Sequence, residues 1–331
     1  MTDTPLSQLP EWAPHERVWI GFPSHEAEWP GVLDEARREV AAFANAVHAD
    51  GAGEAVHLIA ADPASADAAR AFAAPGVIVE EHRFGDIWLR DTGPIIVGSG
   101  AARQARDFGF NGWGGKYEMP GDEDIGARLA ATIGLAVTPQ HWVFEGGALD
   151  VDGTGLAVTT EQCLLHPNRN PDLTREDITA HLSDALGVTR ILWLGDGLAN
   201  DHTDGHVDNL ARFVAANTLA VPVAEGDDDP NEAIYADARA RAAAMGIDTV
   251  AIPSPGLVRR AGEIVPASYM NFYIGNAAVV VPLYGAPNDA AAVEAIGALF
   301  PGREAVGFLA DHILTGGGSF HCISQQVPRI G

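Results

Sequence analysis

Cysteine and long apolar runs are both scarce in this chain of 331 residues. The two cysteines, Cys163 and Cys322, are too few for the disulfide framework of a small secreted domain, so we expect reduced thiols. The most continuous apolar run, Ile274–Leu283, is far too short to cross a bilayer. Residues 1–14 contain aspartate and proline but no apolar run, which argues against a signal peptide. These absences predict a cytoplasmic protein.

Positive charge is scarce as well, with 20 lysine and arginine residues against 45 acidic residues and a formal net charge of -25. A surface this acidic repels nucleic acid and anionic membranes, and it attracts small cations. We therefore expect no nucleic-acid or membrane partner, and the charge favours a small cationic ligand. Solubility, or the salt conditions of the source, is the alternative explanation of the same charge.

Short runs rich in β-branched residues and bordered by Gly, Pro or Asp predict strands along the whole chain. These runs are Val18–Phe22, Val56–Ala60, Val77–Glu80, Ile95–Val97, Leu156–Thr159, Ile191–Leu194, Leu219–Val223, Thr249–Ile252, Ala277–Leu283 and Ala305–Leu309. Apolar residues three and four apart, or alanine-rich composition, predict helices between them. The helical segments are Leu33–Val47, Ser65–Ala73, Asp122–Ile133, Asn231–Met245 and Asp289–Leu299. Since no linker interrupts the alternation, we expect one α/β domain over residues 1–331.

Four short segments concentrate residues that can carry chemistry: Asp86–Pro94, Glu145–Gly147, Asp201–Asp208 and Gly316–Gln326. The last one contains Cys322 and opens with three glycines, which allow backbone conformations closed to other residues. Such a bend before a thiol is one way to present a nucleophile to a substrate.

Each of these residues also has an ordinary structural interpretation when it is considered alone. Asp91 stands before Thr-Gly-Pro, a usual place for a turn or cap aspartate, and Trp88 is a natural core residue. Glu145 fits an exposed acid at the end of a strand. The glycines 316–318 also fit a plain loop or an anion-binding nest, but no Gly-Lys-Ser/Thr follows them, so we expect no nucleotide cofactor.

The histidines and aspartates of the third segment raise the question of a metal site. His202 and His206 are four residues apart with Asp204 between them and Asp208 after them, and such clusters bind zinc or iron. A helical His-Glu-x-x-His site requires glutamate after the first histidine, where threonine stands here, and a glycine precedes the second. In an extended segment, residues 204, 206 and 208 would share one face. We expect no metal here.

Together, these residues suggest a nucleophilic enzyme. A Cys322 thiolate requires a neighbouring positive influence such as His206, and a carboxylate such as Glu145 would orient the imidazole and keep it protonated. Two further carboxylates, Asp91 and Asp208, would oppose ionisation of the thiol unless the substrate carries positive charge. A guanidinium is such a substrate, because its planar N–H donors match carboxylates in bidentate fashion.

Several ordered motifs resemble the agmatine deiminases, a family within the guanidine-modifying enzyme superfamily, and the resemblance covers nearly the whole chain. The motifs are Glu11–Glu16, Trp88–Asp91, Phe110–Tyr117, Glu145–Gly147, Thr159–Leu165, Asn168–Pro171, Asp204–Asp208 and the tail Gly316–Gln326. The resemblance implies a five-bladed, pseudo-fivefold α/β propeller, or pentein, built from five ββαβ-type units with the site in a central cavity.

The resemblance also implies residue roles by motif position. Cys322 would be the nucleophile, His206 the general acid and base, and Glu145 its partner, while Asp91 and Asp208 hold the guanidinium. Trp88 and Trp113 would lie near the substrate channel, Asp204 is a candidate for the distal amine, and Cys163 is expected to be structural. The tail has Ser319 and Phe320 where the family usually has Asn and Ile, which bears on substrate identity.

The implied reaction is hydrolysis of agmatine to N-carbamoylputrescine and ammonia through a covalent thiouronium on Cys322, a step of polyamine biosynthesis. No cofactor is expected, and homo-oligomerisation is left open. Free arginine, peptidyl arginine or another small guanidine is the alternative substrate. A metallohydrolase built on His202 and His206, and a non-enzymatic binding module, are the alternative classes.

Overall fold

The computed structural model describes residues 6–117, 119–226 and 228–329. Most of its strands form five sheets that repeat one connectivity: an antiparallel pair, then a parallel pair whose two strands are joined through a helix. The first sheet contains β18 (Ser324–Pro328), β1 (His15–Gly21), β2 (Ala55–Ala60) and β3 (Ile78–Glu81). The second contains β4 (Ile95–Val97), β5 (Gln104–Gly109) and β6 (Val137–Val143).

The remaining sheets follow the same connectivity. The third contains β7 (Asp150–Val151), β8 (Leu156–Thr160) and β9 (Arg190–Leu194). The fourth contains β10 (Arg212–Ala215), β11 (Thr218–Val223) and β12 (Asp248–Pro253). The fifth contains β15 (Tyr273–Ile274), β16 (Ala278–Leu283) and β17 (Glu304–Leu309), and a small separate hairpin joins β13 (Arg259–Arg260) to β14 (Glu263–Ile264).

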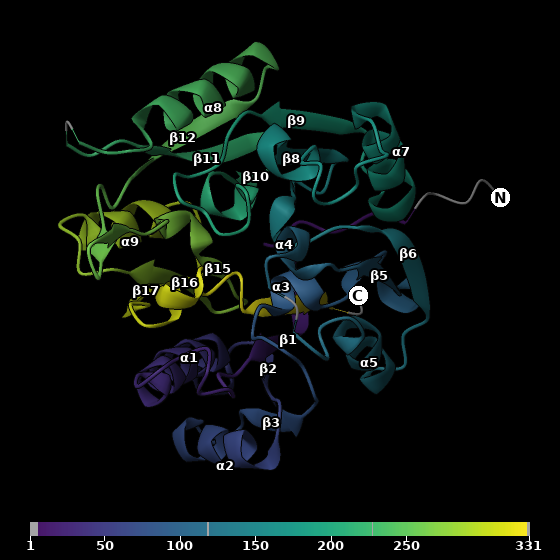
Figure 1. Cartoon of the computed structure of the whole chain (residues 1–331), viewed down its shortest axis with the longest axis vertical. Helices are drawn as coiled ribbons and strands as arrows, with labels where there is room; N and C mark the ends of the chain where they lie inside the picture. The colour runs from purple at the N-terminus through teal and green to yellow at the C-terminus, as the bar shows by residue number, and fades with distance from the viewer. Residues whose placement is uncertain (1–5, 118, 227, 330–331) are drawn as a thin grey trace.

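In each of the five sheets, a helix of two turns or more lies in the connection between the parallel strands described above. These helices are α1 (Leu33–His48), α5 (Ile125–Thr132), α7 (Arg175–Leu186), α8 (Glu232–Ala244) and α9 (Asp289–Gly297). A further helix, α2 (Pro63–Phe72), joins β2 to β3, and three short helices, α3 (Leu89–Thr92), α4 (Gly112–Gly115) and α6 (Glu161–Leu164), follow β3, β5 and β8. In Figure 1 the sheets and their helices surround α3 and α4, which lie near the middle of the view. Loops that meet there can build a shared site.

The two ends of the chain meet in the first sheet. Strand β18 pairs antiparallel with β1, with Trp19 opposite Gln325, and β1 pairs parallel with β2. Cys322 lies just before β18, so this pairing places it beside α3, where its carbonyl oxygen accepts a hydrogen bond from the Arg90 N–H at 3.0 Å. The predicted nucleophile, near the C-terminal end of the chain, is therefore positioned by pairing between β18 and the N-terminal strand β1.

All ten predicted strands and all five predicted helices are present, with shifts of a few residues at their ends. The helix predicted from Asp122 begins at Ile125, because the Asp122 carboxylate accepts hydrogen bonds from the backbone N–H groups of Gly85 and Asp86 in a loop. The mixed α/β class is confirmed.

Several elements were missed by the sequence analysis. Strands β5, β6, β10 and β18 were among them, and β18 is fully buried although it reads Ser-Gln-Gln-Val-Pro, with little apolar content. Helix α7 was missed although its signals are present: a capping box joins Thr174 to Asp177, and Ile178, Leu182 and Leu186 recur at helical spacing on its buried side.

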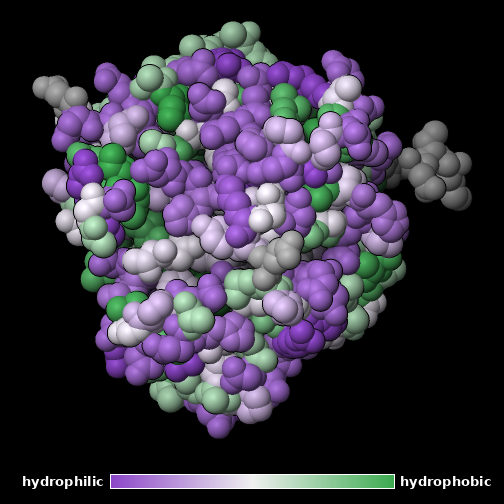
Figure 2. Space-filling view, viewed as in Figure 1, coloured by the Kyte–Doolittle hydropathy of each residue, from purple (hydrophilic) through white to green (hydrophobic). Residues whose placement is uncertain are grey.

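No helix of the described chain is both long and apolar enough to span a membrane. Figure 2 shows a face on which hydrophilic residues dominate and hydrophobic ones occur in small scattered groups. The sequence stretch interpreted above as lacking a signal peptide includes residues 1–5, which lie outside the described residues.

Candidate active site

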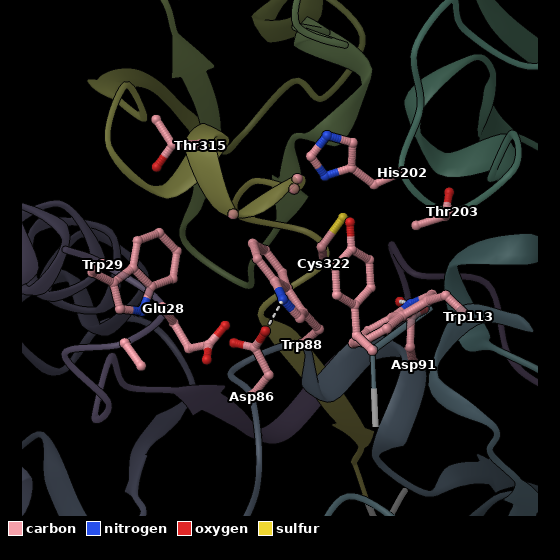
Figure 3. Close-up of a pocket in the computed structure, with 15 residues that line it drawn as sticks. Glu28, Trp29, Asp86, Trp88, Asp91, Trp113, His202, Thr203, Thr315 and Cys322 are labelled. Carbon is pink, nitrogen blue, oxygen red and sulfur yellow. Dashed lines mark hydrogen bonds between the residues drawn. The ribbon is translucent and has the colours of Figure 1, made fainter. Parts of the chain in front are cut away.

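A cavity of about 180 Å³ opens beside Cys322. Segments far apart in the sequence form its walls: the loop before α1, the segment that leads into α3, helix α4, and the two loops that carry His202 and the glycines 316–318. Figure 3 shows Trp88 and Asp91 on one side of Cys322 and His202 on another. The cavity thus joins three of the four segments singled out in the sequence.

The glycine triplet allows the tail to pass close to the aromatic wall. Gly317 has a φ of +106°, a left-handed conformation that favours glycine. A Cβ on Gly318 would lie 2.5 Å from the Trp88 ring, so a larger residue would not fit there. The prediction that these glycines permit close approach beside Cys322 agrees with this geometry.

The Cys322 thiol is buried among polar groups. Its Sγ accepts a hydrogen bond from Asn271 Nδ2 at 3.1 Å and lies 3.5 Å from Asp208 Oδ2. Burial, reinforced by the negative charges of Asp208 and Asp91, raises the pKa of the thiol well above its ordinary value. The site therefore disfavours a thiolate until a positive charge enters it.

His206 is fully buried between two carboxylates. Its Nε2 lies 3.5 Å from Glu145 Oε2, and its Nδ1 lies 3.7 Å from Asp91 Oδ1. Burial lowers the pKa of His206, but the Asp91 charge and hydrogen bonds with Cys163 and Glu145 outweigh burial and raise it well above its ordinary value. A protonated imidazole, ready to act as an acid, is the result.

Glu145 is buried too, and Arg169 compensates its charge. Arg169 Nε donates to the two carboxylate oxygens at 3.0 and 3.3 Å. Burial raises the pKa of Glu145, but His206 and Arg169 together outweigh burial and lower it below the ordinary range. Glu145 therefore remains a carboxylate beside the imidazole and favours its cationic form.

Asp91 is fixed by two donors. The Gly147 N–H donates to its Oδ1 and Trp113 Nε1 donates to its Oδ2, each at 2.9 Å. Gly147 also has to be glycine, because a Cβ there would lie 2.6 Å from His206 Nδ1 and 3.1 Å from Asp208 Oδ2. Burial raises the pKa of Asp91, and the neighbouring carboxylates Asp208 and Glu145 add to the effect against the pull of His206. A cationic ligand would therefore strongly stabilise the ionised form of Asp91.

Asp208 is positioned by a contact with the buried His321. His321 Nδ1 lies 2.7 Å from Asp208 Oδ2, and His321 Nε2 lies 2.7 Å from Glu11 Oε1. Ionised carboxylates are acceptors only, so both ring nitrogens must donate, which requires an imidazolium. Burial raises the pKa of Asp208, but His321 outweighs burial and lowers it. Asp208 Oδ1 has no hydrogen-bond partner among the described residues.

The N-terminal Glu11 completes a buried charge cluster behind the site. It pairs with Arg90 at 3.0 Å and with Arg212, whose Nε also donates to Asp150 Oδ2 at 3.0 Å. Arg212 is fully buried, and its other donors reach the backbone carbonyl groups of Met270 and Phe272. Since every charge here has a partner of opposite sign, the cluster can support the active site from the protein interior.

Asp204 lies elsewhere than the sequence suggested. It adopts a left-handed conformation, φ +63°, ahead of Gly205 at φ +91°, so residues 204, 206 and 208 do not share one face of an extended strand. Its carboxylate pairs with Lys116 and Arg169, which lowers its pKa to about 2 against the effect of burial. Asp204 is not among the residues that line the cavity.

The alternative of a metal site built on His202 and His206 is not supported, because the two side chains do not meet. His202 lines the cavity mouth, while His206 lies buried behind Asp91. Another group, Glu145, Cys163 and His206, brings one donor atom from each residue within 4.8 Å of the others. The Arg169 guanidinium already pairs with Glu145, and burial raises the pKa of the Cys163 thiol. This donor set therefore does not suit a metal cation.

The two departures of the tail from the family pattern are in the core. Ser319 and Phe320 are both buried, and the Phe320 ring stacks on Phe43 with centroids 4.7 Å apart and planes 8° apart. Neither residue lines the cavity. The expectation that these two residues alter substrate choice is therefore not supported by a contact with the cavity.

The sequence analysis assigned no role to several residues that contact the site groups or line the cavity, among them Asn271, His321, Glu28 and Asp86. His321 is adjacent to Cys322 and Asp86 stands two residues before Trp88, so both stood in segments already singled out. Asn271 belongs to no motif, and no signal in the sequence distinguishes it.

Comparison with known proteins identifies the family. The family described as Porphyromonas-type peptidyl-arginine deiminase matches residues 7–328. A Yersinia pestis protein, named provisionally as an agmatine deiminase, is 34% identical over 348 residues, which is 96% of this chain and 94% of the relative. The Enterococcus faecalis agmatine deiminase structure matches with a TM-score of 0.92 at 30% identity, over 98% of this chain and 96% of that one. A Porphyromonas gingivalis structure, named provisionally as an arginine deiminase, matches with a TM-score of 0.87 at 34% identity, over 98% of each chain. The chain therefore belongs to this family of guanidine-modifying enzymes, which includes the agmatine deiminases.

Proposed function

We propose that the protein hydrolyses agmatine to N-carbamoylputrescine and ammonia, with Cys322 as the nucleophile. The observation that carries the proposal is the arrangement of a buried thiol beside two carboxylates, Asp91 and Asp208, with a buried histidine between Asp91 and Glu145. The carboxylates raise the pKa of the free thiol, so they are unfavourable for catalysis unless the substrate is a cation. Agmatine carries a cation at each end.

In this mechanism the guanidinium lies between the two carboxylates. Asp91 and Asp208 accept its N–H groups, and Asp208 Oδ1 supplies an acceptor that is otherwise without a partner in the described chain. The cation lowers the pKa of the Cys322 thiol, whose proton leaves to solvent, and the thiolate attacks the guanidinium carbon. The tetrahedral adduct is neutral, and the carboxylates hold its N–H groups until protonation of the departing amine restores a cation between them.

His206 then carries the protons. As an imidazolium it protonates the departing nitrogen, ammonia leaves, and an S-alkylthiouronium remains on Cys322. The neutral imidazole next removes a proton from water, the resulting hydroxide attacks the same carbon, and the C–S bond breaks. As the bond breaks, the hydroxyl proton of the adduct passes to the leaving sulfur, so the ureido product and the free thiol are released and His206 is again protonated. Glu145 keeps the ring oriented throughout.

Three wider expectations go with this function. The five sheets with one repeated connectivity support the proposal that they are the blades of a pseudo-fivefold propeller, with residues 1–331 forming one catalytic domain. The absence of a disulfide framework in the sequence supports a cytoplasmic location. Asp204 remains a weaker candidate for the distal amine than the sequence analysis suggested, because two cations already pair with it.

Ammonia release from purified protein offered agmatine, arginine and a blocked peptidyl arginine tests the proposal. We expect agmatine to be turned over, with and without a chelator, and no activity in Cys322→Ser. Turnover that a chelator abolishes would support the metallohydrolase alternative. Silence on all three substrates would refute the deiminase proposal.

Arginine is the second candidate, since the Porphyromonas gingivalis relative named for it is 34% identical to this chain. An arginine α-carboxylate would need a cationic partner at the cavity mouth. Among the described residues that line the cavity, His202 is the only group that can carry positive charge, whereas two acids, Glu28 and Asp86, lie on the opposite wall. The charge at the mouth therefore favours agmatine.

A further inference from the structure

We propose that Glu28, supported by Asp86, binds the distal ammonium of the substrate and thereby selects agmatine over arginine. The inference rests on the proposed function and names the residues that recognise the far end of the substrate. It replaces Asp204, the sequence-based candidate for that role, with an acid that faces the cavity.

Glu28 and Asp86 line the same cavity as Cys322, from a different side. Figure 3 shows both acids on the side of Trp88 that faces away from Cys322, with Trp29 beside Glu28. A substrate whose guanidinium reaches Cys322 would run along Trp88 and bring its other end to these carboxylates.

Asp86 is anchored, and Glu28 is left free to bind. The Ile87 N–H donates to Asp86 Oδ1 at 2.7 Å, and Trp88 Nε1 donates to Asp86 Oδ2 at 2.8 Å. The second bond ties the carboxylate to the indole that forms the cavity wall. Glu28 is half-buried and makes no side-chain hydrogen bond or ion pair with the described residues.

The acids at this end lack compensating cations. Within the described ranges, no ion pair is formed by Glu28, Asp86 or the neighbouring Asp122, whose Oδ2 also has no hydrogen-bond partner there. Burial raises the pKa of Asp86 to about 7, with repulsion from Asp122 and Glu28 adding to the effect. Burial likewise raises the pKa of Asp122 to about 6. An ammonium group would supply the missing charge.

The space between the two ends suits an alkyl chain. The Trp29 and Trp88 rings lie with centroids 6.3 Å apart at an interplanar angle of 48°, and Trp113 and Tyr117 line the cavity as well. Aromatic faces attract both methylene groups and a cation. Arginine differs from agmatine by a carboxylate next to the amine, which would face Glu28 and Asp86 and be repelled.

The test compares two substrates that differ only at the distal end. Butylguanidine has the guanidinium and the four-carbon chain of agmatine but no amine. For Glu28→Gln we expect the ratio of kcat/KM for agmatine to kcat/KM for butylguanidine to fall about tenfold, mostly through KM for agmatine. The matched control is Glu26→Gln, which removes an exposed carboxylate of the same loop that does not line the cavity and should leave the ratio unchanged.

A binding experiment keeps the inference testable without turnover. In a Cys322→Ser background, calorimetric titration should give an agmatine Kd about tenfold weaker when Glu28→Gln is added, with butylguanidine Kd unaffected. An unchanged ratio, an equal loss for both ligands, or an equal effect of Glu26→Gln would overturn the assignment of Glu28. Inactivity of the parent enzyme on every guanidine would instead refute the proposed function, and the titration would still decide the role of Glu28.

Discussion

Replacing His321 with glutamine should weaken both the fold and the site, because His321 joins two buried carboxylates. Its ring nitrogens lie 2.7 Å from Glu11 and 2.7 Å from Asp208. Breaking a buried charge pair typically costs about 3–5 kcal/mol. In the variant, Glu11 still pairs with Arg90 and Arg212, and the glutamine amide can still donate one hydrogen bond. We therefore expect a loss of unfolding free energy at the lower end of this range, about 3 kcal/mol.

This cost converts into a measurable change in Tm. An unfolding entropy of about 2.1 cal/mol/K per residue gives about 0.7 kcal/mol/K for 331 residues, so Tm should fall by about 4 °C near pH 7. The pKa of Asp208 is lowered in the native protein by His321, against the effect of burial. A carboxylate with a lowered pKa contributes stability above its unfolded pKa and loses it as the pH falls through its native value. The Tm difference between wild type and variant should therefore shrink below about pH 4.

The same change should alter activity. Without His321, burial raises the pKa of Asp208, so the acid limb of the pH profile of kcat/KM should move to higher pH. If His321 had only a structural role, the substitution would lower Tm and leave the acid limb of the pH profile unchanged. Circular dichroism melts at several pH values, with the ammonia-release assay over the same range, measure both effects.

A matched control is available on the surface. His312 Nδ1 also lies 2.7 Å from a carboxylate, Glu39 Oε1, but 34% of the His312 side chain is exposed. Exposed pairs contribute about 1 kcal/mol or less, so His312→Gln should lower Tm by about 1 °C and leave the pH profile unchanged. The reasoning fails if His321→Gln melts within 1 °C of wild type, or if the two variants behave alike.

Three further predictions concern the reacting groups. Cys322→Ser should abolish turnover while agmatine still binds, as measured by calorimetry; appreciable residual turnover would argue against a covalent intermediate. Trp113→Phe removes the indole N–H that Asp91 accepts at 2.9 Å, and since a hydrogen bond to a charged group contributes about 1.5–3 kcal/mol, kcat/KM should fall about 10- to 100-fold and Tm by about 2–4 °C. Alkylation of Cys322 in the free enzyme by neutral iodoacetamide should be slow near pH 7 and accelerate as pH rises past the ordinary thiol range, because the pKa of the thiol is raised; a rate that is already high and constant near pH 7 would contradict this.

Local patterns in the sequence predicted the strands and helices that have an apolar side. Strands such as β8 and β16 are rich in valine, leucine and alanine and are almost entirely buried, so their composition identifies them. Strand β18 is buried as well, yet its sequence is mostly polar: its backbone pairs with β1, and Gln325 Nε2 donates a hydrogen bond to the Pro94 carbonyl oxygen at 2.9 Å. Composition alone could not reveal such a strand.

The candidate catalytic residue types were inferred from chemistry, since a thiol, a histidine and three acids together suggest attack on a cationic carbon. The structure places Cys322, His206, Glu145, Asp91 and Asp208 close together. Neither their spacing nor their order in the chain contains that information, because spacing describes only neighbours within one turn or one strand.

By itself the sequence determined the α/β class, the family resemblance, and the set of groups that can act on a guanidinium. The tertiary structure decided which acids are free to meet a substrate. Asp204 stands in a recognisable motif and Glu28 in none, but Lys116 and Arg169 pair with the first, whereas the second faces the cavity without a partner in the described chain. The physical reason is that the charge available to a ligand depends on which cations the fold brings within a few ångströms. That is settled only when segments more than 80 residues apart, such as those of Lys116 and Asp204, come together.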